Sequence, residues 1–161
     1  MSFPESMRYN KSYQLTRDID WFFQLNNTPI HVASAGGKLP NQINDRKQLQ
    51  EQQHLVSTLP DINTIAEIHI NHEFIKELCE KTMCEEEVYL ESFISMAKKG
   101  FISMDKTHIE EPEETTYHVV CIPTNYYSGD EIQLINITQE DVDLTSGKQV
   151  LFDLSELFED L

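Results

Sequence analysis

Basic residues are scarce in this sequence. Only 12 of the 161 residues are lysine or arginine, against 28 aspartates and glutamates, so the formal net charge is −16. A protein that binds nucleic acid needs a basic surface to meet the phosphates, and we therefore expect no nucleic-acid partner. No apolar run approaches the roughly 18 residues of a membrane-spanning helix, so we also expect no membrane association.

Cysteine and glycine are scarce as well. The three cysteines are irregularly spaced, which does not suit a disulfide framework, and Cys79 and Cys84 lack the usual spacing of a zinc site. The five glycines form no phosphate-binding signature, and we expect no cofactor. The segment 1–14 has no apolar stretch typical of a signal peptide, so we predict a cytoplasmic protein.

The acidic residues are unevenly distributed along the chain. Residues 1–60 carry a net charge of +1, whereas residues 61–161 carry −17. One interpretation is a solvated surface that keeps the protein in solution. The other is a surface that meets a basic partner, with binding weakened by salt.

Apolar residues recur with period two near the N-terminal end. Every second residue from Ile19 to Leu25 is apolar, which predicts a strand with one buried face. Turn residues follow at 26–29, and the alternation resumes over 30–34, so we predict a β-hairpin.

Helical patterns cluster in the middle of the sequence. The segment 41–58 predicts a solvent-facing helix, and Asn71 is a candidate N-cap for a short helix after a strand that ends at Ile70. Thr82 and Glu85 have capping-box spacing before a third helix, which has acids in its first turn, lysines in its last turn and Gly100 after its end.

We predict a single globular domain over 1–161 with an α+β fold, in which a mainly antiparallel sheet carries a central helical segment packed against it. Strand-like segments in the second half are 117–122, 132–137, 140–144 and 149–152, the last two joined as a hairpin. Residues 1–7 are expected to be a loose N-terminus, 103–116 a mobile acidic loop, and 153–161 a C-terminal amphipathic helix.

One short segment concentrates potential metal ligands. His69, His72 and Glu73 suggest a metal site or a proton-transfer pair, and hence a small metal-dependent hydrolase. The spacing of the two histidines fits no single helical face if a strand ends between them. The competing interpretation is that both imidazoles simply face solvent.

Other reactive residues are expected to be structural. His31 and His118 lie in predicted strands and would need to meet a carboxylate in space to do chemistry. Ser34 has no base that the sequence identifies, Cys84 is followed by glutamates that oppose a reactive thiolate, and the acidic run 110–114 lacks the spacing of a calcium loop. We therefore assign no catalytic residue.

The predicted C-terminal helix has one apolar face, which allows two interpretations. It docks on the core of its own domain, or it lies in a groove of a partner. The residues on that face are Leu154, Leu157, Phe158 and Leu161.

Together these patterns favour a non-catalytic protein-binding module, similar in kind to an immunity or inhibitor protein, that meets another protein with a basic surface. The metal-dependent hydrolase is one alternative. The other is a structural subunit of a homo- or hetero-oligomer.

Overall fold

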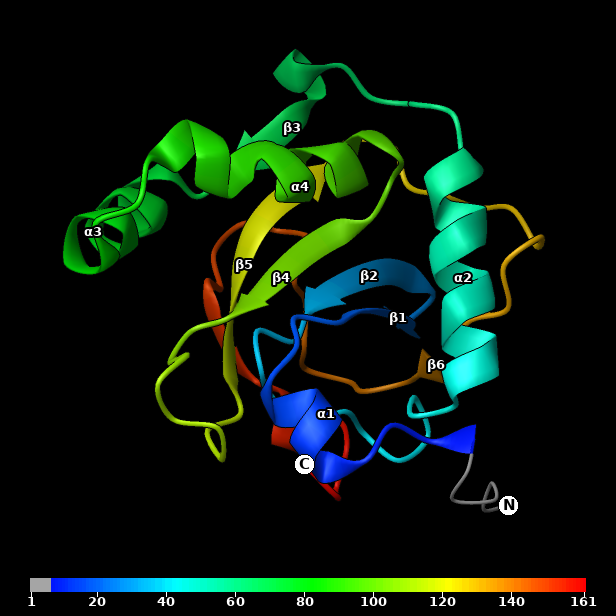
Figure 1. Cartoon of the computed structure of the whole chain (residues 1–161). Helices are drawn as coiled ribbons and strands as arrows, with labels where there is room; N and C mark the ends of the chain where they lie inside the picture. The colour runs from blue at the N-terminus through cyan, green and yellow to red at the C-terminus, as the bar shows by residue number, and fades with distance from the viewer. Residues whose placement is uncertain (1–6) are drawn as a thin grey trace.

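The computed structural model describes residues 7–161, which form an α+β fold. Seven strands make one mixed sheet in the order β3-β5-β4-β2-β1-β6, and β7 also pairs with β5. In Figure 1, α4 crosses the upper part of the molecule, α2 runs along the right side, and α1 lies near the C-terminus at the bottom. The helices are α1 (Lys11–Leu15), α2 (Arg46–Thr58), α3 (His72–Thr82) and α4 (Glu86–Lys98). The strands are β1 (Asp20–Leu25), β2 (Thr28–Ala33), β3 (Ile68–Ile70), β4 (Ile102–Lys106), β5 (Thr116–Pro123), β6 (Asn136–Ile137) and β7 (Leu151–Asp153).

The predicted N-terminal hairpin is confirmed. Strands β1 and β2 pair antiparallel from Asp20 opposite Ala33 to Leu25 opposite Thr28. Asn26 and Asn27 both have positive φ, at 49° and 66°, which is the backbone of a tight two-residue hairpin turn.

The α+β class is confirmed, but the prediction of a mainly antiparallel sheet is wrong. Strand β2 pairs with β4 in parallel, and β1 pairs with β6 in parallel. After β2 the chain forms α2, β3, α3 and α4 before it returns beside β2 in the same direction. Turn residues identify hairpins between neighbours, whereas a parallel pair joined by a long crossover leaves no local signal.

Both faces of β1 are buried. Trp21 and Phe23 enter a large apolar cluster on one side of the sheet, while Phe22 packs with Phe101 and Val56 on the other. The alternation in the sequence indicated only the first of these faces. Helices α2 and α4 cover the second face, where α4 contacts β4 and β5 and α2 contacts β1.

The third predicted helix is confirmed as α4, with Glu86 and Glu87 in its first turn and Lys98 in its last. The capping box is not formed as expected: Thr82 is the last residue of α3, and its hydroxyl donates to the Leu78 carbonyl. Gly100 follows the helix with φ +99°, a left-handed conformation that favours glycine.

The predicted loop 103–116 requires a correction. Its first four residues belong to β4, a buried strand between β2 and β5, and the connecting loop begins at Thr107. Three of these four residues are polar, which is why the segment resembles a loop. In the structure the side chains of Ser103, Asp105 and Lys106 are hydrogen-bonded inside the protein, and Met104 packs in the core.

The C-terminal third also departs from the predictions. Residues 140–144 form no strand, and β7 pairs with β5 rather than with that segment. The segment expected to form a helix over 153–161 contains only a three-residue 3-10 helix, Leu154–Glu156. The prediction of a loose N-terminus over 1–7 lies outside the described residues except for Met7. Within residues 7–161, no helix combines the length and apolar character needed to cross a membrane.

Candidate functional site

A row of residues crosses four strands on the face that the helices cover. Asp20 on β1 is opposite Ala33 on β2, Ala33 is beside Asp105 on β4, and Asp105 is opposite His118 on β5. Polar side chains thus lie under the helical layer, where they need partners because burial without a hydrogen bond is costly. Two separate polar groups supply those partners.

The first group joins Asp20, His31 and Ser103. The His31 ring lies between them, with Nδ1 2.7 Å from the Ser103 hydroxyl and Nε2 2.8 Å from an Asp20 carboxylate oxygen. The order of these groups is that of a Ser-His-Asp triad, but the exposure is reversed: Ser103 is fully buried, whereas the Asp20 side chain is 49% exposed. A substrate could not reach the hydroxyl, so this group is structural.

The second group joins Asp105, Tyr89, His118 and Thr107. The Tyr89 hydroxyl donates to Asp105 Oδ2 at 2.6 Å and lies 2.7 Å from His118 Nε2. The other ring nitrogen of His118, Nδ1, is 3.0 Å from the Thr107 hydroxyl. The chain of hydrogen bonds therefore runs from a carboxylate through a phenol and an imidazole to a hydroxyl.

Burial controls the charges of this group. It raises the pKa of Asp105 to about 7, and the nearby negative charges of Asp18 and Asp20 act in the same direction. Burial also lowers the pKa of His118 to about 3, so the imidazole is neutral at neutral pH. The 4.0 Å approach of His118 Nε2 to Asp105 is therefore a contact between a carboxyl group and a neutral ring, not an ion pair.

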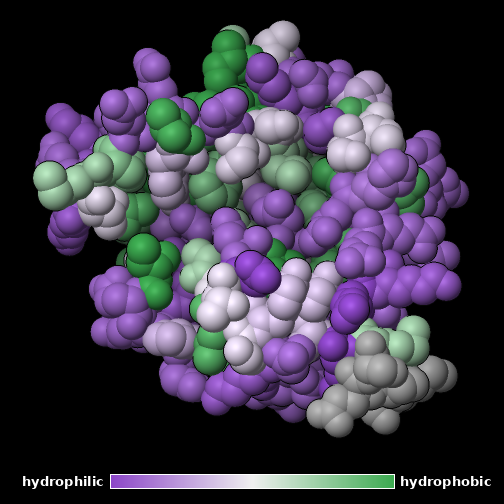
Figure 2. Space-filling model, in the orientation of Figure 1, coloured by the Kyte–Doolittle hydropathy of each residue, from purple (hydrophilic) through white to green (hydrophobic). Residues whose placement is uncertain are grey.

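Asp105 and Tyr89 open onto a cavity of about 720 Å³, which we call the Asp105 cleft. It lies between α3 and the segment that follows β4, where Figure 2 shows an indentation on the left of the molecule. Its walls are largely apolar and aromatic, formed by Phe74, Leu78, Tyr89, Ile109 and Leu151.

Lys106 shapes one wall of the Asp105 cleft. The residue is only 1% exposed, and its ammonium group donates to the carbonyl oxygens of His108 and Glu111, both at 2.6 Å. Burial lowers the pKa of Lys106, and the carboxylates of the following loop oppose that shift. The lysine thus fastens the loop to β4 and points away from Asp105.

A second surface feature lies on α3, α4 and the turn between them. Met83 is 94% exposed and Val88 is 67% exposed, which is unusual for large apolar side chains. Exposed carboxylates lie on the same helices and turn together with Lys76, Lys81 and Lys98, and within residues 7–161 none of these carboxylates has a lysine or arginine nitrogen within 4.0 Å. We call this surface the α3–α4 acidic face; its acids are Glu80, Glu85, Glu86, Glu87 and Glu91.

The structure does not gather the predicted metal ligands into a metal site. His69, His72 and Glu73 line one cavity of about 530 Å³, and His69 Nε2 lies 3.1 Å from the Asn71 side-chain oxygen. Among the described residues, no three or more His, Cys, Asp or Glu side chains are placed to hold a metal ion together.

The other sequence candidates have structural surroundings. Ser34 is buried and its hydroxyl accepts from the Ile19 backbone N–H at 2.8 Å. Cys84 is exposed in the turn after α3, with the Thr82 hydroxyl 3.3 Å from its sulfur. The acidic run 110–114 lies in the loop that Lys106 holds. His31 and His118 do each meet a carboxylate, but two different ones.

The apolar residues proposed for a partner groove lie in this chain's own core. Leu154 and Phe158 are fully buried and Leu157 is 9% exposed, in the cluster that contains Trp21. Leu161 packs against the same cluster. In this structure these side chains cover the chain's own sheet.

Sequence reasoning missed the second polar group almost entirely. Asp105 and Thr107 fall within the predicted loop 103–116, and no motif in the sequence links them to Tyr89. The one available signal was an aspartate and a lysine directly after the apolar pair Phe101 and Ile102, which fits a strand end as well as a loop. Comparison with protein-family models, with curated proteins and with solved structures found no match for the chain.

Proposed function

We propose that this protein is a non-catalytic binding protein and that its α3–α4 acidic face contacts a partner with a basic surface. The observation that carries the proposal is the pair of exposed apolar side chains, Met83 and Val88, on either side of the exposed run Glu85–Glu87, whose carboxylates have no ion-pair partner in the described chain. Apolar centres with polar rims are typical of protein interfaces. An inhibitor-like or immunity-like role is the form of this function that fits best.

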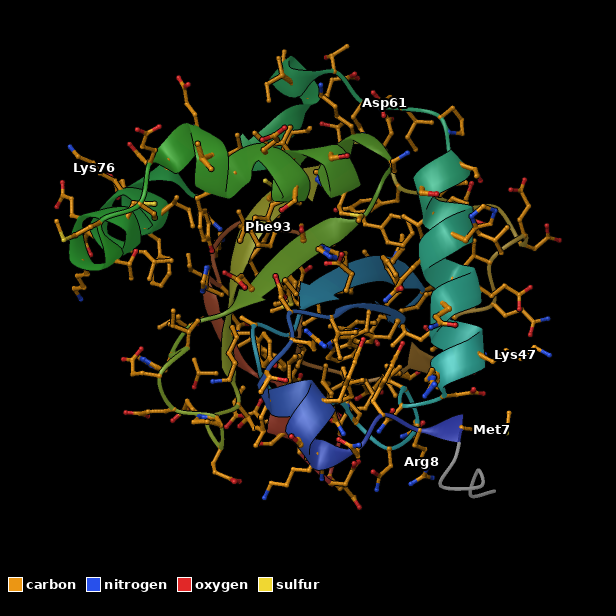
Figure 3. All side chains as sticks on the ribbon, viewed as in Figure 1. Met7, Arg8, Lys47, Asp61, Lys76 and Phe93 are labelled. Atoms are coloured by element: carbon orange, nitrogen blue, oxygen red, sulfur yellow. The ribbon has the colours of Figure 1, made fainter. Side chains whose placement is uncertain are left out.

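Basic residues are not confined to one part of the molecule. In Figure 3, Arg8 and Lys47 lie near the bottom and on the right, away from α3 and α4, whereas Lys76 lies on α3 itself. Residues 72–98, from the start of α3 to the end of α4, carry seven acids and three lysines, a net charge of −4. A negative patch of this kind steers a basic partner and raises its association rate at low salt.

Two hollows along α4 support contact with a partner. A hollow of about 600 Å³ runs along α4 from Glu87 to Lys98, and one of about 400 Å³ lies between Lys76 on α3 and the start of α4; Glu87 lines both. Val88 and Ile94 add apolar area to the larger one. Such hollows receive protruding side chains, which is how interface residues reach full burial.

Capture experiments with the wild-type protein and two variants test this proposal. The wild-type protein is immobilised and exposed to lysate of cells that express it naturally, at 50 and 500 mM salt. The first variant, Glu86→Gln/Glu87→Gln/Glu91→Gln, neutralises three acids of the acidic face. The matched control, Asp130→Asn/Glu131→Gln/Glu140→Gln, removes the same charge from exposed positions on other segments.

We expect the wild type and the control to retain a basic protein at 50 mM salt, identified by mass spectrometry. We expect at least tenfold less of it at 500 mM salt or with the first variant. Equal capture by all three proteins overturns the proposal, as does capture that is unchanged by salt. If no basic protein is retained by the wild type, the proposal also fails.

A metal-dependent hydrolase is not favoured, because the described residues contain no group of three ligands in position. No observation singles out a surface for self-association either.

A further inference from the structure

We infer that the Asp105 cleft receives the guanidinium group of an arginine side chain that the partner presents. This inference rests on the proposed function and deepens it by naming the group that is recognised. It stands on three observations: a carboxylate without a cationic partner, aromatic and apolar walls, and the position of the cleft beside the α3–α4 acidic face.

Asp105 is a nearly buried carboxylate with no cation beside it. The residue is 8% exposed, and within residues 7–161 no lysine or arginine nitrogen lies within 4.0 Å of its oxygens. Lys106, its neighbour in sequence, is held by two loop carbonyls, and His118 is neutral. A buried charge of this kind is stabilised when a partner supplies the opposite charge.

The hydrogen bonds of Asp105 leave room for a ligand. Tyr89 donates to Oδ2, the backbone N–H of Lys106 also acts on the carboxylate, and no side chain of the described residues donates to Oδ1. A carboxylate has about four acceptor sites and a guanidinium group carries five N–H donors in a planar fork, so the group can bind Asp105 at a remaining site. The Tyr89 hydroxyl can keep its bond to Oδ2 at the same time.

The walls of the cleft suit the rest of an arginine side chain. Phe74 and Tyr89 offer aromatic rings, on which a guanidinium group stacks better than an ammonium group does. Ile109 and Leu151 are 56% and 48% exposed, and both line the cleft, where they can cover the methylene groups of the side chain.

The rim of the cleft has mixed charge. Glu77, Glu110 and Lys81 lie on it. The ammonium group of Lys106 is already bound to two carbonyl oxygens. Together with Asp105 there are thus three carboxylates against the one remaining ammonium group, that of Lys81. Cys84 lines both this cleft and the hollow beside Glu85, Glu86 and Glu87. A partner seated on the acidic face is therefore in reach of the cleft.

The test uses small probes, so that it does not depend on finding the partner. Nα-acetyl-arginine methylamide is titrated into the isotope-labelled full chain and followed by NMR. The corresponding citrulline compound serves as the neutral isostere, and the lysine compound carries the same charge without the planar group. Asp105→Asn is the test variant, and Asp130→Asn, which loses the same charge outside the cleft, is the matched control.

We expect the arginine compound to shift the signals of Phe74, Tyr89 and His118, with at least tenfold weaker binding to Asp105→Asn and unchanged binding to Asp130→Asn. The lysine compound should bind several-fold more weakly and the citrulline compound should not bind. Citrulline that binds as well as arginine, or Asp105→Asn that binds like the wild type, overturns the inference. Equal binding of lysine and arginine contradicts the preference for a guanidinium group.

The outcome is separable from that of the capture experiment. If the arginine compound binds but no basic protein is captured, the cleft recognises a free guanidinium compound and the proposed function fails. If a basic protein is captured equally by the wild type and Asp105→Asn, the partner binds outside the cleft and only this inference fails.

Discussion

Asp105 and His118 are directly opposite each other on β4 and β5, yet the hydroxyl group of Tyr89 on α4 lies within hydrogen-bond distance of both. The helix thereby supplies the polar partner that the strands lack. Either protonation state of Asp105 keeps both hydrogen bonds of the Tyr89 hydroxyl group. An ionised Asp105 accepts from Tyr89, which accepts from His118 Nε2–H; a protonated Asp105 donates to Tyr89, which donates to Nε2.

The first prediction concerns stability against pH. Asp105 has a pKa near 7 in the folded chain, against about 3.9 for an unperturbed aspartate. Between these values the folded chain binds one proton more than the unfolded chain, so Asp105 lowers the free energy of unfolding as pH rises. Asp105→Asn has no titrating group at this position, so this decrease in the free energy of unfolding with pH is absent. We expect the variant to gain stability relative to the wild type between pH 4 and 8, by up to about 4 kcal/mol.

Urea unfolding of both proteins at pH 4.5, 6 and 7.5 measures this gain. The low pKa of His118 has the opposite effect on stability: its contribution to the free energy of unfolding grows as pH rises from about 3 toward 6.5. Because His118 is present in both proteins, this contribution cancels in the difference between them. A difference between the two proteins that is flat over this range contradicts the prediction.

The second prediction is that Tyr89→Phe destabilises the fold by about 1–3 kcal/mol, because it leaves two buried groups, Asp105 and His118, without their shared partner. The pKa of Asp105 should also rise further, since the Tyr89 hydrogen bond lowers it. Chemical denaturation and NMR titration of the carboxyl carbon measure the two effects. Tyr13→Phe is the control, because that ring is 38% exposed, and it should change stability by less than about 0.5 kcal/mol.

The third prediction concerns the loop after β4. Lys106→Met keeps the apolar stem of the side chain but removes the donor to the carbonyl oxygens of His108 and Glu111. We expect backbone amides of residues 107–115 to exchange with deuterium at least tenfold faster, while those of β1 and β2 are unchanged. Lys148→Met, at an exposed position, should leave the whole pattern as it is. Unchanged protection of the loop in Lys106→Met would show that the lysine does not fasten it.

The elements that the sequence predicted correctly are those with local signals. The β1–β2 hairpin has its turn asparagines, and α4 has charges matched to its dipole and a glycine after its end. Strand β4 has no such signal, because its polar residues Ser103 and Asp105 interrupt the apolar pattern of a buried strand. Their hydrogen-bond partners, His31 and Tyr89, lie far from them in the sequence or on another element. The candidate site depends on this long-range pairing, so its residues were invisible as a group.

The last prediction distinguishes a core role from a partner role for the C-terminal segment. Phe158 is fully buried with its ring 5.6 Å from that of Trp21 and 5.2 Å from that of Phe23. Phe158→Ala should cost about 3–5 kcal/mol, as is typical when a large core side chain is removed. Glu159→Ala, an exposed neighbour, should cost less than about 0.5 kcal/mol.

Deletion of residues 153–161 extends the same test. It removes Leu154 and Phe158 from the cluster around Trp21 and Asp153 from its pairing with Thr116. Because that cluster contains residues of β1, β2, β4 and β5, we expect the shortened chain to lose cooperative unfolding and the fluorescence of a buried Trp21. A shortened chain that stays folded, with only a smaller mass in light scattering, would instead mean that the segment holds two copies of the protein together.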